Sequence, residues 1–306
     1  MFPPSIAKGD QIAVISPAGY VEMAQIEKSL KLIQDNGFVP VLGKHIDGQL
    51  DNGYLYSGSE KERQEDLNWA LNDSNIAAIW ATRGGYGCQH LLQSFDSQSF
   101  LKNPKWYIGY SDNTAIQSKI FQLGYASIHG QTLKTSSFGV DPSAYSLIFD
   151  ILQGSYPNYE FVSHHLNKQG TASGKMVGGN LALIYALLGT QYTPIFQNNL
   201  LFIEEIGEEF YALDRMLMSL EHNGVFEKIS GLLVGGMINM GKEALNPYFE
   251  DSFDPFAYKL IRERVEKYRF PVAFGFPNGH IYDNKPLILG AEYILNTTGT
   301  LYIDLT

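Results

Sequence analysis

The stretch WYIGYSDNTAIQSKIFQL, residues 106–123, runs from an apolar segment through a glycine turn into a helical pattern. Residues 106–109 suit a buried strand, Gly109 permits a tight turn at its end, and the helical spacing of apolar residues begins near Thr114. Similar strand-like runs recur through the first half of the chain, and helical patterns separate them. The other strands expected there are 11–16, 38–42, 76–81 and 125–128. This alternation predicts an α/β fold in which a parallel sheet carries helices on both faces.

The helices expected in the first half follow those strands. They are a helix with Ile26, Leu30 and Ile33 on one face, then 59–72, 114–123 and 144–152. The amino-acid composition changes at 154–170, which is rich in Ser, Asn, His and Gly and has no sustained periodicity, so the domain junction is expected there. We therefore predict an N-terminal domain of residues 1–160 and a C-terminal domain of residues 161–306.

The second half predicts a smaller, mixed α/β domain with a different sheet. Strands are expected at 200–204 and 232–235, with a helix between them that has Leu213, Leu217 and Leu220 on one face. Further helices are expected at 181–188 and 255–268. The tail, 286–305, is expected to be β-rich, with turns at Gly290 and Gly299.

Bulk composition narrows the class of protein. The chain has 306 residues, a formal net charge of -10 and one cysteine, Cys88. An acidic chain is a poor general binder of nucleic acid, although it can still bind a small anion through a local cluster of Arg or Lys. One cysteine fits a reducing compartment. The sequence shows neither a signal-peptide pattern nor an apolar run near 18 residues, so we expect a soluble cytoplasmic protein without a membrane partner.

The segment Gly109-Tyr110-Ser111-Asp112-Asn113 has the layout of a nucleophile elbow, in which a serine stands between a strand and a helix. The usual elbow has a second glycine two residues after the serine, where this chain has Asn113. The competing interpretation is that Ser111 and Asp112 only cap the following helix, since both residue types are favoured N-caps.

A glycine-rich loop, Thr82-Arg83-Gly84-Gly85-Tyr86-Gly87, follows the expected strand 76–81. Glycines let a backbone approach a ligand and present its amides, and an oxyanion donor is expected at this edge of a parallel sheet. The loop lacks the Lys-Ser/Thr ending of a P-loop and the spacing of GxGxxG, so nucleotide binding is not favoured. The remaining alternative is an ordinary turn.

A serine nucleophile needs a base, and the base needs an orienting acid. His129 follows an expected strand and His280 lies in a Gly/Pro/Asn loop; spacing alone does not choose between them. For the acid, Glu204 ends the buried run 200–204, whereas helix capping or solvent exposure is the ordinary expectation for Glu205. No metal-binding spacing is present, and Cys88 is expected to be a packing residue.

Taken together, these motifs resemble those of the LD-carboxypeptidases, or muramoyltetrapeptide carboxypeptidases, which are serine peptidases of bacterial cell-wall recycling. The resemblance spans nearly the whole chain and depends on the order and spacing of several short motifs. The matching segments are Ile15-Ser16-Pro17-Ala18-Gly19, Arg83-Gly84-Gly85-Tyr86-Gly87, Gly109-Tyr110-Ser111-Asp112, Gly178-Gly179-Asn180-Leu181, Phe202-Ile203-Glu204-Glu205, Asp214-Arg215-Met216-Leu217, and Gly279-His280 with Asn284.

The resemblance implies a catalytic triad of Ser111, Glu204 and His280, with oxyanion donors at the backbone amides of Gly85 and Asp112. It also implies a flavodoxin-like N-terminal domain that carries the serine, a C-terminal domain that carries the acid and base, and a homodimer. One departure is visible near the base: the family usually has a Leu-Pro step after Asn284, and this chain reads Leu-Ile-Leu-Gly at 287–290.

The reaction implied by the resemblance is hydrolysis of the bond between an L-configured centre and the terminal D-Ala of a muropeptide, without a cofactor or metal. Arg83 or Arg215 is a candidate to bind the free carboxylate of that substrate. Two alternatives stay open: a hydrolase of the microcin-C self-immunity type, and a non-catalytic protein that binds peptide in a cleft.

Overall fold

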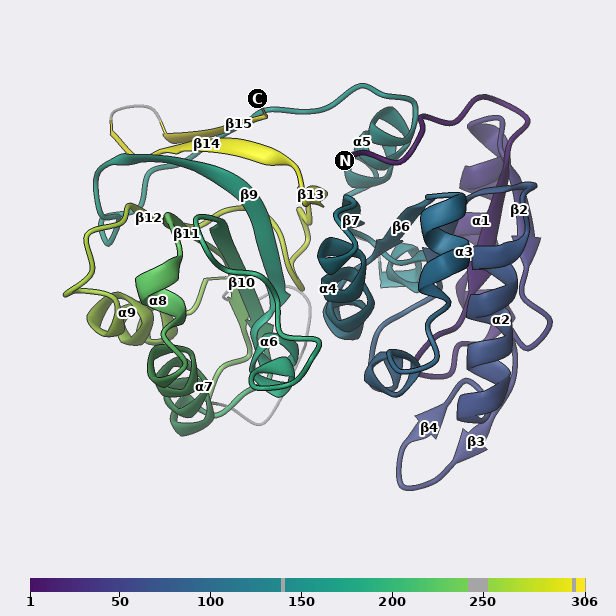
Figure 1. Cartoon of the computed structure of the whole chain (residues 1–306), viewed down its shortest axis with the longest axis horizontal. Helices are drawn as coiled ribbons and strands as arrows, with labels where there is room; N and C mark the ends of the chain where they lie inside the picture. The colour runs from purple at the N-terminus through teal and green to yellow at the C-terminus, as the bar shows by residue number, and fades with distance from the viewer. Residues whose placement is uncertain (139–140, 242–252, 299–300, 306) are drawn as a thin grey trace. The chain divides into compact units, whose positions relative to one another are not determined.

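The structure is a computed structural model that describes residues 1–138, 141–241, 253–298 and 301–305. The chain divides into two compact units, Met1–Ser155 and Tyr156–Thr306 (Figure 1). Each unit has its own sheet and its own helices, and each is described here by itself. Among the described residues, no helix combines the length and the apolar character needed to cross a membrane.

The first unit is built on a parallel sheet with the strand order β7-β6-β5-β1-β2. In chain order this is the arrangement 2-1-3-4-5 of flavodoxin-like folds, so the expected fold is confirmed. Its strands are β1 (Gln11–Ile15), β2 (Val39–Leu42), β5 (Ile76–Ala81), β6 (Trp106–Gly109) and β7 (Ser127–His129).

Helices cover both faces of this sheet. On one face, α1 and α5 lie together, because Phe38, which follows α1, stacks on Phe149 of α5. On the other face, α2 packs beside α3, where Ser99 donates a hydrogen bond to Asn72. The helices are α1 (Glu27–Asp35), α2 (Glu60–Asn72), α3 (Ser97–Lys102), α4 (Thr114–Gln122) and α5 (Ser143–Leu152), and the short 3-10 turns are η1 (Met23–Gln25), η2 (Cys88–Leu91), η3 (Ser111–Asn113) and η4 (Leu133–Phe138).

A small hairpin, β3 (Leu50–Asp51) and β4 (Leu55–Tyr56), was not anticipated from the sequence. It projects from the first unit (Figure 1) and is tied back to it by a bridge between Gly19 and Tyr56. The hairpin places Tyr54 over the glycine-rich loop, where its hydroxyl accepts a hydrogen bond from the amide of Tyr86 at 3.1 Å.

The second unit has a mixed sheet with the strand order β12-β11-β10-β9-β14-β15-β8. Strands β9 to β12 are parallel, and β14, β15 and β8 are antiparallel, which confirms the expected mixed α/β class. The strands of this sheet are β8 (Tyr159–Phe161), β9 (Thr171–Asn180), β10 (Leu200–Ile206), β11 (Gly231–Ile238), β12 (Val272–Phe274), β14 (Glu292–Asn296) and β15 (Leu301–Leu305). The same unit contains β13 (Leu287–Leu289), which is not part of this sheet.

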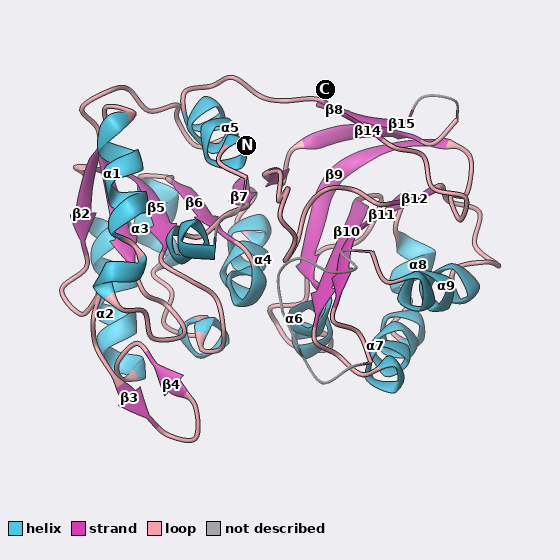
Figure 2. Ribbon diagram, turned by 180° about the vertical axis from the view of Figure 1, so that it is seen from behind, coloured by secondary structure: helices cyan, strands magenta, loops and turns pink. Residues whose placement is uncertain are grey.

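Four helices accompany the described part of this sheet: α6 (Leu181–Leu187), α7 (Phe210–His222), α8 (Val225–Lys228) and α9 (Pro255–Arg264). Helix α6 lies at the end of β9 and β10 (Figure 2). The expected apolar face of α7 is buried, because Leu213, Leu217 and Leu220 have no exposed surface. The helix expected at 255–268 ends earlier, at Arg264. The turn expected at Gly299 lies outside the described residues.

Candidate active site

Ser111 stands on a strained turn between β6 and α4. Its backbone has a φ of 63°, in the left-handed region, which costs a residue with a side chain roughly 1–2 kcal/mol. Neither Tyr110, the N-cap of η3, nor Asn113, the N-cap of α4, makes a side-chain capping bond among the described residues. Ser111 makes no such bond there either, so the structure shows a strained turn between a strand and a helix rather than a side-chain helix cap.

Asn113 occupies the position where an elbow usually has its second glycine. Its Oδ1 accepts a hydrogen bond from the hydroxyl of Tyr107 at 2.6 Å, and its Nδ2 donates to the carbonyl of Tyr110 at 3.0 Å. A Cβ on Gly109 would stand 2.7 Å from Cγ of Asn113. The space that Gly109 leaves is therefore filled by Asn113, which explains how this turn closes with a single glycine.

The glycine-rich loop lies directly against the serine. A Cβ on Gly84 would stand 2.8 Å from Cβ of Ser111, 3.0 Å from its Oγ and 3.3 Å from the amide nitrogen of Asp112. The amide of Asp112 falls in the first turn of a helix, where the helix itself supplies no acceptor. Within the described residues, the amide of Gly85 donates no hydrogen bond. Two amides thus stand near Ser111 at the carboxyl edge of the sheet.

The side chain of Asp112 ties the elbow to the far end of the same loop. Its carboxylate is fully buried and its Oδ2 accepts the amide of Cys88 at 2.7 Å. Burial raises the pKa of Asp112 to about 6, against the opposing effects of the Cys88 hydrogen bonds and the charge of Arg63. Cys88 itself is buried and packs there, as expected.

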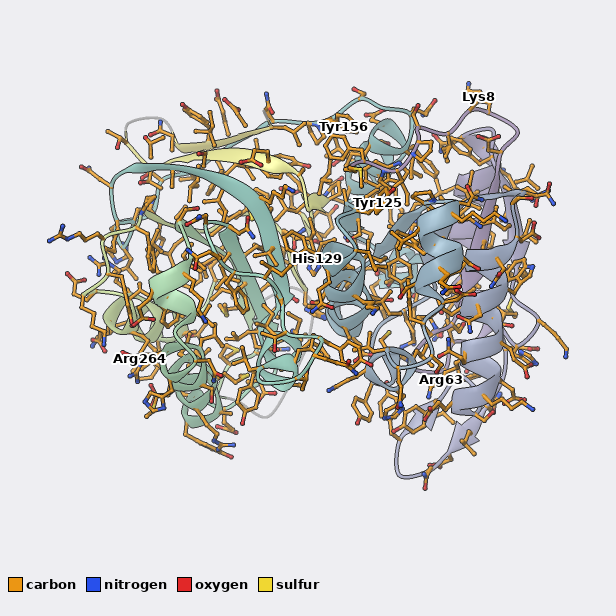
Figure 3. All side chains as sticks on the ribbon, in the orientation of Figure 1. Lys8, Arg63, Tyr125, His129, Tyr156 and Arg264 are labelled. Atoms are coloured by element: carbon orange, nitrogen blue, oxygen red, sulfur yellow. The ribbon has the colours of Figure 1, made fainter. Side chains whose placement is uncertain are left out.

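Arg63 holds the loop from its other side and was missed in the sequence. It reaches from α2 (Figure 3) and is buried, with Nη1 donating to the carbonyls of Pro17 at 2.8 Å and Gly87 at 2.9 Å. A Cβ on Gly87 would stand 2.6 Å from Nη1 of Arg63. Helix α2 reads as a polar surface helix, so no local pattern marks this arginine.

The two arginines proposed for substrate binding have different surroundings. Arg83 is a half-buried residue of the glycine-rich loop, and its Nη1 donates to the carbonyl of Tyr20 at 2.7 Å. Arg215 lies on the exposed face of α7 in the second unit, with its guanidinium carbon 5.4 Å from the ring centre of Tyr211. Only Arg83 belongs to the unit that carries Ser111.

In the second unit, Glu204 and His280 form a buried pair. Oε2 of Glu204, near the end of β10, lies 2.8 Å from Nδ1 of His280. A Cβ on Gly279 would stand 3.0 Å from that same oxygen, so the histidine loop packs closely on the carboxylate. The amide of Gly279 donates to Oδ1 of Asn284 at 3.0 Å, which fixes the loop.

The protonation of His280 is set by its neighbours. Burial lowers the pKa of His280, but the charge and hydrogen bond of Glu204, with a smaller effect of Glu205, outweigh it and raise the pKa. In the neutral ring the Nδ1 proton points to Glu204, so Nε2 is the basic nitrogen.

Glu205 faces the opposite side of β10, because successive residues of a strand alternate. It is buried, and it accepts the amide of Ala182 at 2.7 Å and Nδ2 of Asn180 at 2.9 Å. Burial, together with the charge of Glu204, raises the pKa of Glu205 to about 7. Of the two roles expected for Glu205, capping of α6 is therefore correct and solvent exposure is wrong.

The other candidate base, His129, is in a different environment. It is fully buried, and its Nδ1 lies 3.2 Å from Oε1 of Gln117, a neutral amide. His280, in contrast, has a carboxylate partner. In the part of the chain that the structure describes, no group of three His, Cys, Asp or Glu side chains is placed to hold a metal ion.

Known proteins share this chain's architecture and part of its sequence. The models of the LD-carboxypeptidase N-terminal and C-terminal domains match residues 12–130 and 173–295. The probable murein peptide carboxypeptidase of Bacillus subtilis is 30% identical, over 96% of this chain and 91% of that protein. The microcin C7 self-immunity protein MccF of Escherichia coli is 26% identical, over 95% and 92%.

The likeness extends to solved structures. The crystal structure of muramoyltetrapeptide carboxypeptidase from Oxalobacter formigenes has a TM-score of 0.84 at 23% identity, over 96% of this chain and 98% of that one. These matches cover both units and confirm the resemblance inferred from the motifs. The chain belongs to the LD-carboxypeptidase family.

Proposed function

We propose that this chain is a serine carboxypeptidase that releases the terminal D-Ala from muramyl tetrapeptide in peptidoglycan recycling. The observation that carries the proposal is the left-handed backbone of Ser111, a strain that a helix cap does not require and that presents a nucleophile. The substrate class is supported by the names of the relatives, a murein peptide carboxypeptidase and a muramoyltetrapeptide carboxypeptidase.

In the proposed reaction, Ser111 attacks the carbonyl between the L-configured centre and D-Ala. Nε2 of His280 takes the proton of Ser111, and Glu204 orients the ring and stabilises its charge. The amides of Gly85 and Asp112 hold the oxyanion, where loss of one donor typically costs about 10²–10³ in rate. His280 then gives the proton to the leaving amine, and water hydrolyses the acyl-enzyme.

The same proposal assigns the nucleophile to the N-terminal domain, residues 1–160, and the acid and base to the C-terminal domain, residues 161–306. Arg83 or Arg215 binds the free carboxylate of the substrate. We also place the protein in the cytoplasm as a homodimer: the single buried cysteine suits a reducing compartment, and the dimer follows from the family resemblance.

The proposal is tested by mass spectrometry of muramyl tetrapeptide incubated with the protein. The wild type is expected to remove one alanine, and Ser111→Ala to remove none. Ser118→Ala is a matched control, because Ser118 is a buried serine on α4 whose hydroxyl has no partner among the described residues. Full turnover by Ser111→Ala would contradict the assignment of the nucleophile.

The relationship to MccF supports a second candidate activity, cleavage of a processed aminoacyl-sulfamoyl adenylate. Comparison of turnover on this compound and on muramyl tetrapeptide separates the two activities, because the preferred substrate has the higher kcat/KM. Tight binding of the tetrapeptide by a wild type that turns over neither compound would favour the non-catalytic alternative.

A further inference from the structure

Lys134 is a basic residue at the carboxyl edge of the first sheet to which the proposed mechanism gives no role. It lies just after β7, at the start of η4, and is half-buried. Its amide donates a hydrogen bond to the carbonyl of Thr82 at 2.8 Å. Since Thr82 immediately precedes Arg83, the two basic residues start from neighbouring points of the backbone.

The charge of Arg83 acts on Lys134. Burial lowers the pKa of Lys134, the charge of Arg83 lowers it further, and Glu22 acts in the opposite direction. Among the described residues, no carboxylate lies within ion-pair distance of either cation, and Glu22 is exposed. Arg83 donates to the carbonyl of Tyr20, and Nζ of Lys134 lies 5.8 Å from the ring centre of Phe138. Neither partner carries a negative charge, so a bound anion would relieve the repulsion between these two half-buried cations.

Tyr54 adds a hydroxyl donor to the surroundings of Arg83. A Cβ on Gly19 would stand 2.5 Å from the Tyr54 hydroxyl oxygen and 3.2 Å from Cζ of Arg83. Burial raises the pKa of Tyr54 although Arg83 lowers it, so the hydroxyl remains protonated. The hydroxyl oxygen accepts a hydrogen bond from the amide of Tyr86, so the hydroxyl proton can be donated in a second hydrogen bond.

The position of this cluster relative to Ser111 suits an exopeptidase. Strands β5, β6 and β7 are neighbours, and they are followed by Arg83, Ser111 and Lys134 respectively. Gly84, the residue after Arg83, has no room for a Cβ because of Ser111. The free carboxylate of a C-terminal residue lies one residue, about 4 Å, from the scissile carbonyl.

We propose that Arg83 and Lys134, assisted by the Tyr54 hydroxyl, form the subsite that binds the free C-terminal carboxylate of the substrate. This proposal rests on the proposed carboxypeptidase function, and it assigns the recognition of the carboxylate to Arg83 rather than to Arg215. The guanidinium offers a planar pair of donors to a carboxylate, and the ammonium adds a second charge.

The first test compares two substrates, muramyl tetrapeptide with a free C-terminal carboxylate and the same peptide with a C-terminal amide. Lys134→Met is expected to lower kcat/KM for the free acid about 10- to 100-fold, mainly through KM, and to leave the amide unchanged. Lys134→Arg keeps most of the preference. Lys28→Met, which removes an exposed lysine of α1, controls for the loss of one positive charge.

A second test does not need turnover. In the Ser111→Ala background, isothermal titration with N-acetyl-D-alanine and with its methyl ester compares Lys134 with Lys134→Met. The substitution is expected to weaken binding of the acid about tenfold and not that of the ester. Thermal unfolding of each variant shows whether it is folded.

The two tests separate the two proposals. Release of D-Ala by the wild type, with no selective effect of Lys134→Met on acid over amide or ester, overturns the subsite and leaves the function standing. Absence of D-Ala release, with a selective loss of acid binding, overturns the function and supports the subsite.

Discussion

Replacement of Gly84 by alanine should damage catalysis more than folding. The added Cβ would stand 2.8 Å from Cβ of Ser111, about 0.6 Å closer than the 3.4 Å at which ordinary contact begins. It would also lie 3.3 Å from the amide of Asp112. The methyl group must therefore displace the serine, the proposed oxyanion amide or the loop itself.

The size of the effect follows from this displacement. Overpacking of this kind costs about 1–3 kcal/mol of stability. A misplacement of about 1 Å costs on the order of 10²-fold in rate, so a shift of roughly half that is expected to lower kcat about 10- to 100-fold. The backbone of Gly84 is not left-handed, so alanine adds no conformational strain of its own.

Gly48→Ala is the matched control. Gly48 is in the same unit, its backbone is also not left-handed, and a Cβ there would stand 3.1 Å from the carbonyl oxygen of His45. It should lose stability without losing kcat. The assay measures D-Ala release and thermal unfolding of both variants. A folded Gly84→Ala variant with wild-type kcat/KM would refute the contact between this loop and the nucleophile.

Three further predictions concern the buried polar groups. Glu204→Gln should move the acid limb of the pH profile of kcat/KM to lower pH, because burial then lowers the pKa of His280 against only the smaller effect of Glu205. The maximal rate should fall about 10⁴-fold, as when a triad acid is replaced by its amide. An unmoved limb would argue against His280 as the base. The pKa of Asp112 is raised to about 6 in the folded chain, so its contribution to stability is greatest below pH 4 and is lost as the pH rises to 6, a change of up to about 3 kcal/mol. Asp112→Asn lacks this change, and urea unfolding at pH 4 and pH 8 should show a smaller loss of stability with rising pH than in the wild type. Tyr54→Phe leaves the amide of Tyr86 without its acceptor and should lower kcat/KM for D-Ala release several-fold. Thermal unfolding of this variant is expected to show the same Tm as the wild type.

Much of the fold could be predicted from local sequence patterns. The expected strand 106–109 matches β6, and the expected helix 114–123 matches α4 to within one residue, since an apolar run and Gly109 define both. Strand β9 could not be read in the same way. Its glycines weaken the strand pattern, but Gly178 is required because a Cβ there would overlap the carbonyl of Phe202 on β10. That requirement is visible only when the two strands are paired.

The candidate site shows the same limit. Ser111 was marked by its own neighbours in sequence. The contact that supports His280 over His129 as the proposed base joins residues 76 positions apart, His280 and Glu204. No sequence pattern around Lys134 predicts a role in binding, because only the folded chain places this residue beside the backbone of Thr82.

The left-handed backbone of Ser111 also bears on how this chain evolves. A glycine there would relieve the conformational cost, so selection for stability alone favours the loss of the serine. A lineage that no longer needed the hydroxyl would be expected to drift toward glycine or asparagine at this position within few substitutions. The serine is thus kept at a conformational cost, as expected of a residue whose hydroxyl serves the proposed reaction.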